Sequence, residues 1–194
     1  MKTGRLEAFS DGVLAIVITI MVLEMKAPED TTFKGLLSVA PIFISYLLSF
    51  IYLGVYWNNH HHLMQVTQKV NGKILWANLH LLFWLSLIPF TTSWIGEDSH
   101  HTVALPVATY GFVLLMCAVA YFILERVLIA YHDENFALSK LCKSTVKDYI
   151  SVGVYIISIP LAFVNTWLSI ACYVLVALIW LMPDKQLEDL MEDM

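Results

Sequence analysis

The stretch RLEAFSDGVLAIVITIMVLEM, residues 5–25, decides the class of fold. It has the character of a membrane-spanning helix, yet the uncharged run between Asp11 and Glu24 is only twelve residues, Gly12 to Leu23. A bilayer core of about 30 Å takes roughly 20 apolar residues per helix. An ionised side chain in hydrocarbon costs at least about 2.5 kcal/mol, so this helix is poorly suited to face lipid along its length. We expect it to lie inside an assembly or beside water.

The composition of the whole chain is that of an integral membrane protein. Hydrophobic residues make up 59% of the 194 residues and charged residues 14%, and the mean hydropathy is +0.71. A soluble domain of this size could not hide so much apolar surface in one core. Four further uncharged runs are long enough to span a bilayer: 35–57, 74–96, 99–124 and 149–183. The last would measure about 52 Å as one straight helix, so we divide it at the polar and aromatic triplet Asn165, Thr166 and Trp167.

The predicted fold is therefore all-α, with one six-helix transmembrane unit over residues 1–183 and an acidic cytoplasmic tail at 184–194. The six spans are expected near 7–25, 35–57, 74–95, 102–125, 148–164 and 168–182. Nine of the eleven Lys and Arg residues fall on the side of the N-terminus, and only Lys26 and Lys34 on the other. Because basic residues are retained in the cytoplasm, both termini are expected there, in a multi-pass protein of the cell membrane. The tail is either a short amphipathic helix that helps subunits associate or an ordinary solvated segment.

Polar residues within or beside the other spans offer few chemical sites. Three adjacent histidines, His60 to His62, end the second predicted helix, and since adjacent side chains point in different directions we expect no metal site there. His80 lies one turn from Trp76 and Trp84, and a polar ring at that depth needs a partner, either as a satisfied packing residue or as a proton relay. Four prolines lie within predicted spans and are expected to kink them: Pro41, Pro89, Pro106 and Pro160.

The first helix carries one face of evenly spaced residues, namely Gly12, Ile16, Thr19, Ile20 and Leu23. Spacings of three and four residues place them on one side, which is either a packing stripe or the lining of a water-filled space. At the start of this helix, Arg5 and Asp11 form either an exposed ion pair, worth at most about 1 kcal/mol, or part of a polar network. The candidate partners in that network are Trp57, Asn58, His60 and His80.

These residues resemble a known family. The pattern Arg5-x-x-x-Phe9-Ser10-Asp11, followed by a short apolar helix, is similar to the first helix of the endolysosomal potassium channel family, transmembrane protein 175, in its bacterial form. The similarity extends over the whole chain, with YWNNHH at residues 56–61 closing the second helix and LHLLFWLSLIPF at 79–90 in the third. Bacterial members carry one six-helix unit, as this chain does, and the animal channel carries two.

The resemblance implies a homotetramer whose four first helices line a central pore. By position relative to Phe9, it places Ile16, Ile20 and Leu23 at apolar constriction rings that act as the gate, and Thr19 in a hydroxyl layer linked to cation preference. It also implies a polar network that supports the pore helix outside the path of the ion. It places Arg5, Ser10 and Asp11 in that network, and we expect Phe9, Trp57, His60 and His80 to belong to it as well.

We therefore expect a passive, potassium-permeable cation channel that conducts monovalent cations across the lipid bilayer. It is expected to be no enzyme, to need no cofactor or metal, and to bind no nucleic acid. The chain contains no Gly-rich phosphate loop, HExxH motif, serine elbow or TVGYG filter loop. The alternative is a proton-coupled secondary transporter that uses His80 and Asp11 as a relay. A membrane-embedded enzyme is a weaker alternative, because the spans offer few convergent polar groups.

Overall fold

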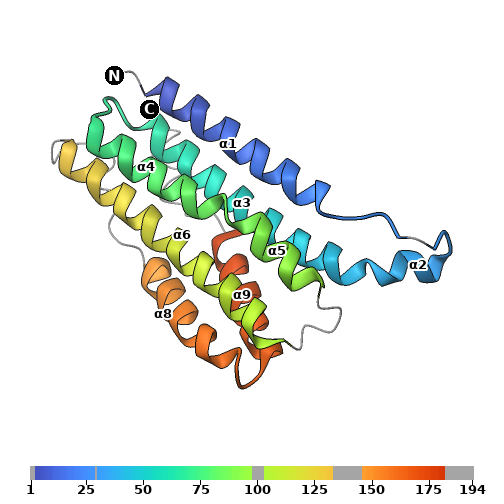
Figure 1. The fold of residues 1–194 in the computed structure, drawn as a ribbon. Coiled ribbons are helices and arrows are strands. Elements are labelled where there is room, and N and C mark those ends of the chain that lie inside the picture. Colours follow the sequence, from blue (N-terminus) through green and yellow to red (C-terminus); the bar gives the residue numbers. More distant parts are fainter. Residues whose placement is uncertain (1–2, 29, 98–102, 133–145, 182–194) are drawn as a thin grey trace.

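The computed structural model describes residues 3–28, 30–97, 103–132 and 146–181, and all regular secondary structure in these ranges is α-helical (Figure 1). Four helical segments are long and apolar enough to cross a membrane: α1, α3, α4 together with α5, and α6. The prediction of an all-α protein with several membrane spans is confirmed to this extent. The predicted tail at 184–194 lies outside the described residues. The helices are α1 Gly4–Leu23, α2 Phe33–Ser38, α3 Ala40–Gln65, α4 Gly72–Leu85, α5 Ile88–Glu97, α6 Ala104–Tyr131, α8 Val146–Leu161 and α9 Thr166–Leu181.

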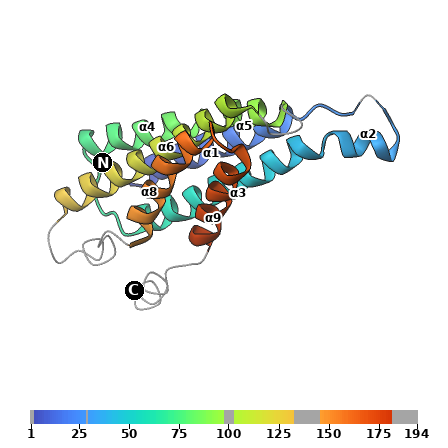
Figure 2. The same ribbon diagram turned by 90° about the horizontal axis from the view of Figure 1, so that it is seen from below.

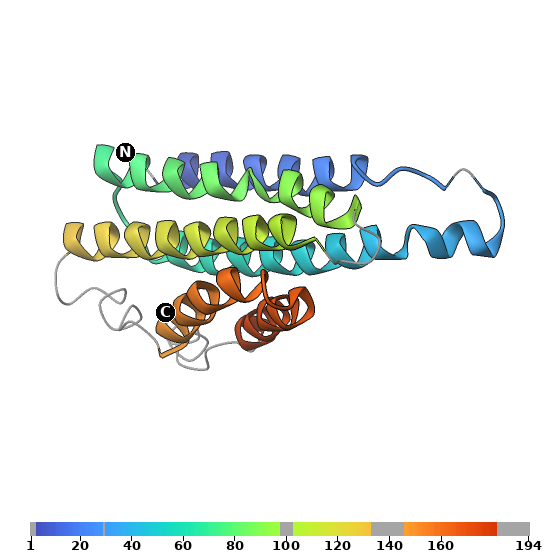
Figure 3. The same cartoon turned by 60° about the horizontal axis from the view of Figure 1, so that its bottom comes forward.

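The long helices run side by side, each antiparallel to the next along the chain, and α8 and α9 pack against α6 and α3 (Figure 3). The α2 helix and the first turns of α3 project beyond the other helices (Figure 2). At the opposite end of the bundle, Thr3 Oγ1 donates to the Thr67 carbonyl at 2.8 Å. The Lys69 amide there donates to His132 Nε2 at 3.4 Å. The start of α1, the α3–α4 connection and the end of α6 therefore meet at one end.

Two apolar cores hold the helices together. The first lies between α1, α3, α4 and α6 and includes the fully buried Leu53, Leu81 and Leu124. The second lies between α3, α6, α8 and α9 and is built around Leu114 and Tyr173. Because α3 and α6 contribute to both cores, they join the α1 side of the subunit to the α8–α9 side.

Asparagine side chains cap the N-termini of two helices. Asn71 Oδ1 accepts a hydrogen bond from the Ile74 amide at 3.0 Å and caps α4. Asn165 Oδ1 accepts from the Leu168 amide at 3.2 Å and caps α9. Such a cap satisfies one of the amides that has no partner within the helix. The chain between α8 and α9, residues 162–165, therefore turns at the polar triplet that begins with Asn165.

The second and fourth predicted spans are longer than expected. Helix α3 continues past residue 57 to Gln65, so the three histidines lie within its last turns. Helix α6 continues past residue 125 to Tyr131. Neither glycine nor proline occurs between residues 55 and 65 or between 112 and 131, so no helix breaker stops either helix where its uncharged run ends.

The prediction that all four prolines kink their spans is wrong for two of them. Pro41 and Pro106 lie in the first turns of α3 and α6, where an amide would have no partner within the helix and its absence costs nothing. Pro89 is the second residue of α5, just after the interruption at Ser86 and Leu87, and it cannot donate to the carbonyl four residues earlier. Pro160 lies inside α8, one residue before its end.

Candidate functional site

Helix α1 has a buried face and an exposed face. The buried face packs against α3, α4 and α5 and consists of Leu6, Ser10, Leu14, Val17 and Met21. The five residues singled out by their spacing all lie on the exposed face, where Ile16 is 60% and Leu23 75% accessible. The chain's own core therefore leaves this apolar stripe free to meet another subunit, lipid or a water-filled space.

Thr19 is the polar residue of this exposed stripe. Its Oγ1 donates a hydrogen bond to the Ala15 carbonyl one turn earlier, at 2.7 Å. A hydroxyl has one donor and two acceptor lone pairs, so the oxygen can still accept a hydrogen bond from water or lie next to a cation. The stripe thus offers one hydroxyl oxygen between apolar turns of the helix.

A buried chain of hydrogen bonds holds the buried face of α1 against its neighbours. Asn78 of α4 donates through Nδ2 to Ser10 Oγ at 2.9 Å, and Ser10 donates to the Leu6 carbonyl at 2.9 Å. The Asn78 Oδ1 atom lies 2.7 Å from His60 Nε2 of α3. Ser10 and Asn78 are fully buried and His60 is 2% exposed. Three helices are thereby joined through one asparagine, whose amide both donates and accepts.

A second, more exposed set of contacts involves Glu7 and Asp11 of α1. Trp57 donates through Nε1 to Asp11 Oδ1 at 3.0 Å. His61 Nδ1 lies 3.0 Å from Glu7 Oε1, and its ring stacks on Trp57 with centroids 5.8 Å apart. Gln65 Nε2 lies 2.7 Å from the other ring nitrogen of His61. These contacts tie the first turns of α1 to the last turns of α3.

The structure brings Ser10, Asp11, Trp57 and His60 to the α1–α3–α4 interface and leaves three predicted members of the network out of it. Arg5 is exposed and makes no hydrogen bond or ion pair within the described part of the chain. Phe9 is 53% exposed. His80 accepts a hydrogen bond from Trp84 Nε1 at 3.0 Å, within α4 itself. The two residues are four positions apart on one helix, so the His80 ring has its hydrogen-bond partner within α4.

Four residues of these contacts were not predicted from the sequence: Glu7, His61, Gln65 and Asn78. Asn78 carried a usable signal, because an amide inside an apolar helix needs partners that only neighbouring helices supply. His61 also lies one turn from Trp57 on α3. The acceptor role of Glu7 had no signal in the sequence, since a charged residue in the first turn of a helix is usually solvated.

The first two of the three adjacent histidines have different partners. His60 faces Asn78, whereas His61 faces Glu7. The His60 and His61 rings therefore point in different directions, as expected for neighbours on a helix, whereas the His61 and His62 rings lie in contact, with centroids 5.7 Å apart. Among the residues that the structure describes, no three His, Cys, Asp or Glu side chains are grouped so that they could hold a metal ion.

Comparison with known proteins gives consistent similarities. The profile of the family described as endosomal/lysosomal potassium channel TMEM175 matches residues 5–89. A protein of Chryseobacterium named a potassium channel is 56% identical, over 97% of both chains. The crystal structure of a homologue of the lysosomal potassium-selective channel TMEM175 from Chamaesiphon minutus superposes with a TM-score of 0.79 at 28% identity. It covers 92% of this chain and 95% of that one.

A vertebrate relative matches only in part. The rat protein named endosomal/lysosomal proton channel TMEM175 is 28% identical over 67% of this chain, which corresponds to 26% of the rat protein. The bacterial relative, in contrast, matches from end to end. On the profile match, the full-length relative and the shared fold, this chain belongs to the TMEM175 family.

Proposed function

We propose that this protein is a homotetrameric, potassium-permeable cation channel with four copies of α1 around a central pore. The observation that carries the proposal is that α1 has two faces. One is buried and hydrogen-bonded to its neighbours, and the other is exposed, apolar and contains Thr19. A helix with protein on one side and a pore on the other does not need a full apolar run. We infer potassium as the permeant ion from the similarity to relatives named potassium channels.

In this arrangement Ile16, Ile20 and Leu23 form successive apolar rings that act as the gate. A narrow aliphatic ring empties of water, and a cation cannot pass it without losing hydration. A small rotation or dilation of the four helices opens the ring. Thr19, one turn from Ile16, provides four hydroxyl oxygens where a partly dehydrated ion needs them.

The contacts behind α1 support its position. Ser10, Asp11, Trp57 and His60 bind the pore helix to α3 and α4 outside the ion path, together with Asn78. Arg5, Phe9 and His80 have other surroundings within one chain and are not assigned to this support. Because these buried hydrogen bonds require one arrangement of the three helices, they hold the register of α1 while the opposite face lines the pore.

The proposed unit comprises six transmembrane helices over residues 1–183, with α8 and α9 as short spans, and the tail at 184–194 in the cytoplasm. Arg5, Lys69 and Lys73 flank the end of the bundle where α1 begins, whereas Lys26 and Lys34 flank the other end. Basic residues are retained in the cytoplasm. Both termini are therefore placed inside, and the protein in the cell membrane.

The test is the current across planar bilayers that contain the purified protein, with potassium on one side and sodium on the other. We expect a reversal potential that favours potassium and moves toward zero in Thr19→Ala. The matched control is Thr109→Ala, because Thr109 makes the same bond one turn back, to the Leu105 carbonyl at 2.8 Å, on α6.

Two results would reject parts of this proposal. Equal shifts of the reversal potential in Thr19→Ala and Thr109→Ala would show that Thr19 does not line the ion path. The absence of unitary currents from well-folded protein, combined with saturable proton-coupled uptake into vesicles, would indicate the secondary transporter instead.

A further inference from the structure

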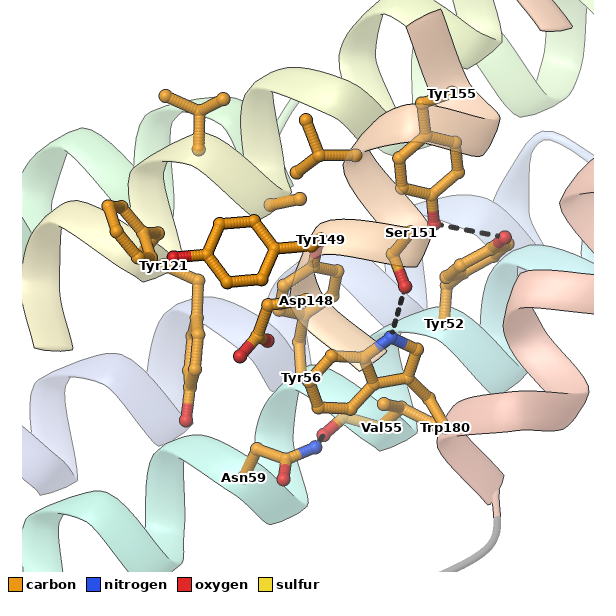
Figure 4. A pocket seen from close by; sticks show the side chains of 14 residues that line it. Tyr52, Val55, Tyr56, Asn59, Tyr121, Asp148, Tyr149, Ser151, Tyr155 and Trp180 are labelled. Atoms are coloured by element: carbon orange, nitrogen blue, oxygen red, sulfur yellow. Dashed lines mark hydrogen bonds between the residues drawn. The ribbon is translucent and has the colours of Figure 1, made fainter. Parts of the chain in front are cut away.

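A cavity of about 260 Å³ lies between α3, α6, α8 and α9, and none of its fourteen lining residues belongs to α1 (Figure 4). Seven of the lining residues are aromatic and four are valine or alanine. Protein interiors contain few voids larger than a water molecule, because the atoms around a void lose dispersion contacts. The cavity is therefore more stable when an apolar molecule fills it.

The polar groups of the inner wall are used by the protein itself. Tyr52 donates through its hydroxyl to the Tyr173 carbonyl at 2.6 Å, and Tyr155 donates to the Tyr52 hydroxyl at 3.2 Å. Trp180 donates through Nε1 to Ser151 Oγ at 2.8 Å (Figure 4). With these donors occupied, this wall presents ring faces and aliphatic groups to the cavity.

The other polar residues of the lining are engaged as well. Asn59 uses its Nδ2 to donate to the Val55 carbonyl at 2.8 Å. Asp148 and Tyr121 already take part in interactions of their own. The lining thus suits a hydrocarbon better than a ligand that is recognised through its charge or its hydrogen bonds.

The cavity opens on an apolar surface of α8. Tyr149 of the lining is 66% exposed, and its neighbour Ile150 is 46% exposed. Further along α8, Ile156 and Ile157 are also exposed. A continuous exposed apolar surface marks contact with a membrane or with another protein, and α8 is one of the proposed spans. The opening therefore leads to the hydrocarbon of the bilayer.

Arg126 marks the depth of the cavity in the bilayer. Its guanidinium lies 4.7 Å from the centre of the Phe122 ring, and Phe122 lines the cavity. Arg126 is exposed near the end of α6, at the end of the bundle where α1 begins. Within the ranges that the structure describes, it makes no ion pair. Arginines near the ends of spans extend to the lipid headgroups, so the cavity lies about one helical turn deeper, where the acyl chains begin.

We propose that this cavity binds one acyl chain of a phospholipid from the leaflet at this end of the bundle. The chain lies among the aromatic rings, and the phosphate lies beside Arg126, which provides a matching charge at headgroup level. An acyl chain is narrow and flexible, and the bilayer supplies it at high local concentration. The inference requires the membrane-spanning fold but not the channel activity, so either proposal can fail without the other.

The experiment uses the full-length protein in detergent micelles and a phosphatidylcholine that carries a nitroxide near the glycerol end of one acyl chain. Quenching of tryptophan fluorescence is measured in the unmodified protein, in Trp180→Phe and in Trp76→Phe, and the differences give the signals of the two residues. Trp180 lines the cavity, whereas Trp76 is 75% exposed on α4. We expect quenching of Trp180 to saturate at a probe concentration at least about tenfold below that for Trp76, because the cavity buries additional methylene groups. Similar curves for the two tryptophans would overturn the proposal.

Variants separate the site of the chain from that of the phosphate. Ala118→Phe places a ring in the cavity, and Ala171→Phe makes the same change at an exposed position of α9. The first should raise the probe concentration that quenches Trp180 at least about tenfold, and the second should leave it unchanged. Arg126→Gln should weaken binding of the phosphatidylcholine but not of a diacylglycerol with the same labelled chain, which lacks the phosphate.

Two further results would contradict the proposal. Equal effects of the two phenylalanine variants would overturn the site of the chain. Equal effects of Arg126→Gln on the two probes would overturn the position of the phosphate. Because the comparison of the tryptophans does not use Ala118→Phe, it tests the proposal even if that variant fails to fold.

Discussion

At the scale of single residues, buried polar groups determine how α1 is held. Ser10, Asn78 and His60 come from three helices. Along the chain, Asn78 is 68 residues from Ser10 and 18 residues from His60. In an apolar bundle a polar group is tolerated when it finds a partner, and each such bond contributes modestly. The penalty for leaving one unpaired is larger than the gain from forming it. The network therefore selects one register of α1 against α4.

Ser10→Ala tests this role. The substitution leaves the Asn78 amide without its acceptor, so we expect the free energy of unfolding to fall by about 1–3 kcal/mol. The matched control is Ser86→Ala, because the Ser86 side chain is exposed and its hydroxyl donates to the Phe83 carbonyl on the same helix; its effect should stay within about 0.5 kcal/mol. Equilibrium unfolding of the detergent-solubilised protein measures both, and equal effects would argue against the network.

At the scale of helices, the close approach of α6 and α9 depends on a glycine. A Cβ atom on Gly111 would overlap the Tyr173 hydroxyl. That hydroxyl cannot move freely, because it donates to the Val107 carbonyl at 3.1 Å and accepts from Ser169 Oγ at 2.9 Å. The missing side chain thus lets a buried tyrosine join α6 and α9 in the second core.

Gly111→Ala should therefore destabilise the protein although alanine favours helices. Overpacking in a well-filled core costs about 1–3 kcal/mol. Gly153→Ala on α8 is the control, because a Cβ there meets nothing within 4 Å; it should be neutral or stabilise the helix by up to about 1 kcal/mol. Thermal unfolding followed by circular dichroism distinguishes them, and similar midpoints in the two variants would show that Tyr173 moves aside readily.

At the scale of the whole molecule, the exposed face of α1 is the part that a single chain leaves unexplained. Ile16, Ile20 and Leu23 are more than 40% accessible on a helix whose other face is well packed. Four chains of 22.1 kDa arranged around these faces would close the assembly with the stripe at its axis. Closed rotational symmetry is the usual arrangement of homo-oligomers.

Ile16→Ala and Leu23→Ala are expected to raise the leak current several-fold, because wider and less apolar rings retain water. Ile157→Ala on α8 is the control, because it makes the same change at a similar exposure: Ile157 is 64% accessible and Ile16 is 60% accessible. It should leave the current unchanged in bilayer recordings. Unaltered leak in both α1 variants would place the gate elsewhere.

The proposed orientation can be tested with single cysteines in intact cells. Thr31→Cys lies in the exposed connection between α1 and α2, and Gln68→Cys in the exposed connection between α3 and α4. A membrane-impermeant thiol reagent should modify the first in intact cells and the second only after lysis, since the basic residues place that end inside. The unsubstituted chain gives the background from its own cysteines. The reverse pattern would invert the topology.

The sequence by itself determined the membrane class, the helical fold and the two faces of α1. These follow from local properties: hydrophobic content, the length of apolar runs and a spacing of three to four residues. Only the tertiary structure decided which polar side chains meet. Asn78 bridges Ser10 and His60 because α1 packs against both α3 and α4, whereas His80, two residues further along α4, accepts a hydrogen bond from Trp84 on its own helix. Local periodicity assigns a residue to a face, but partners distant in the chain depend on how the helices pack.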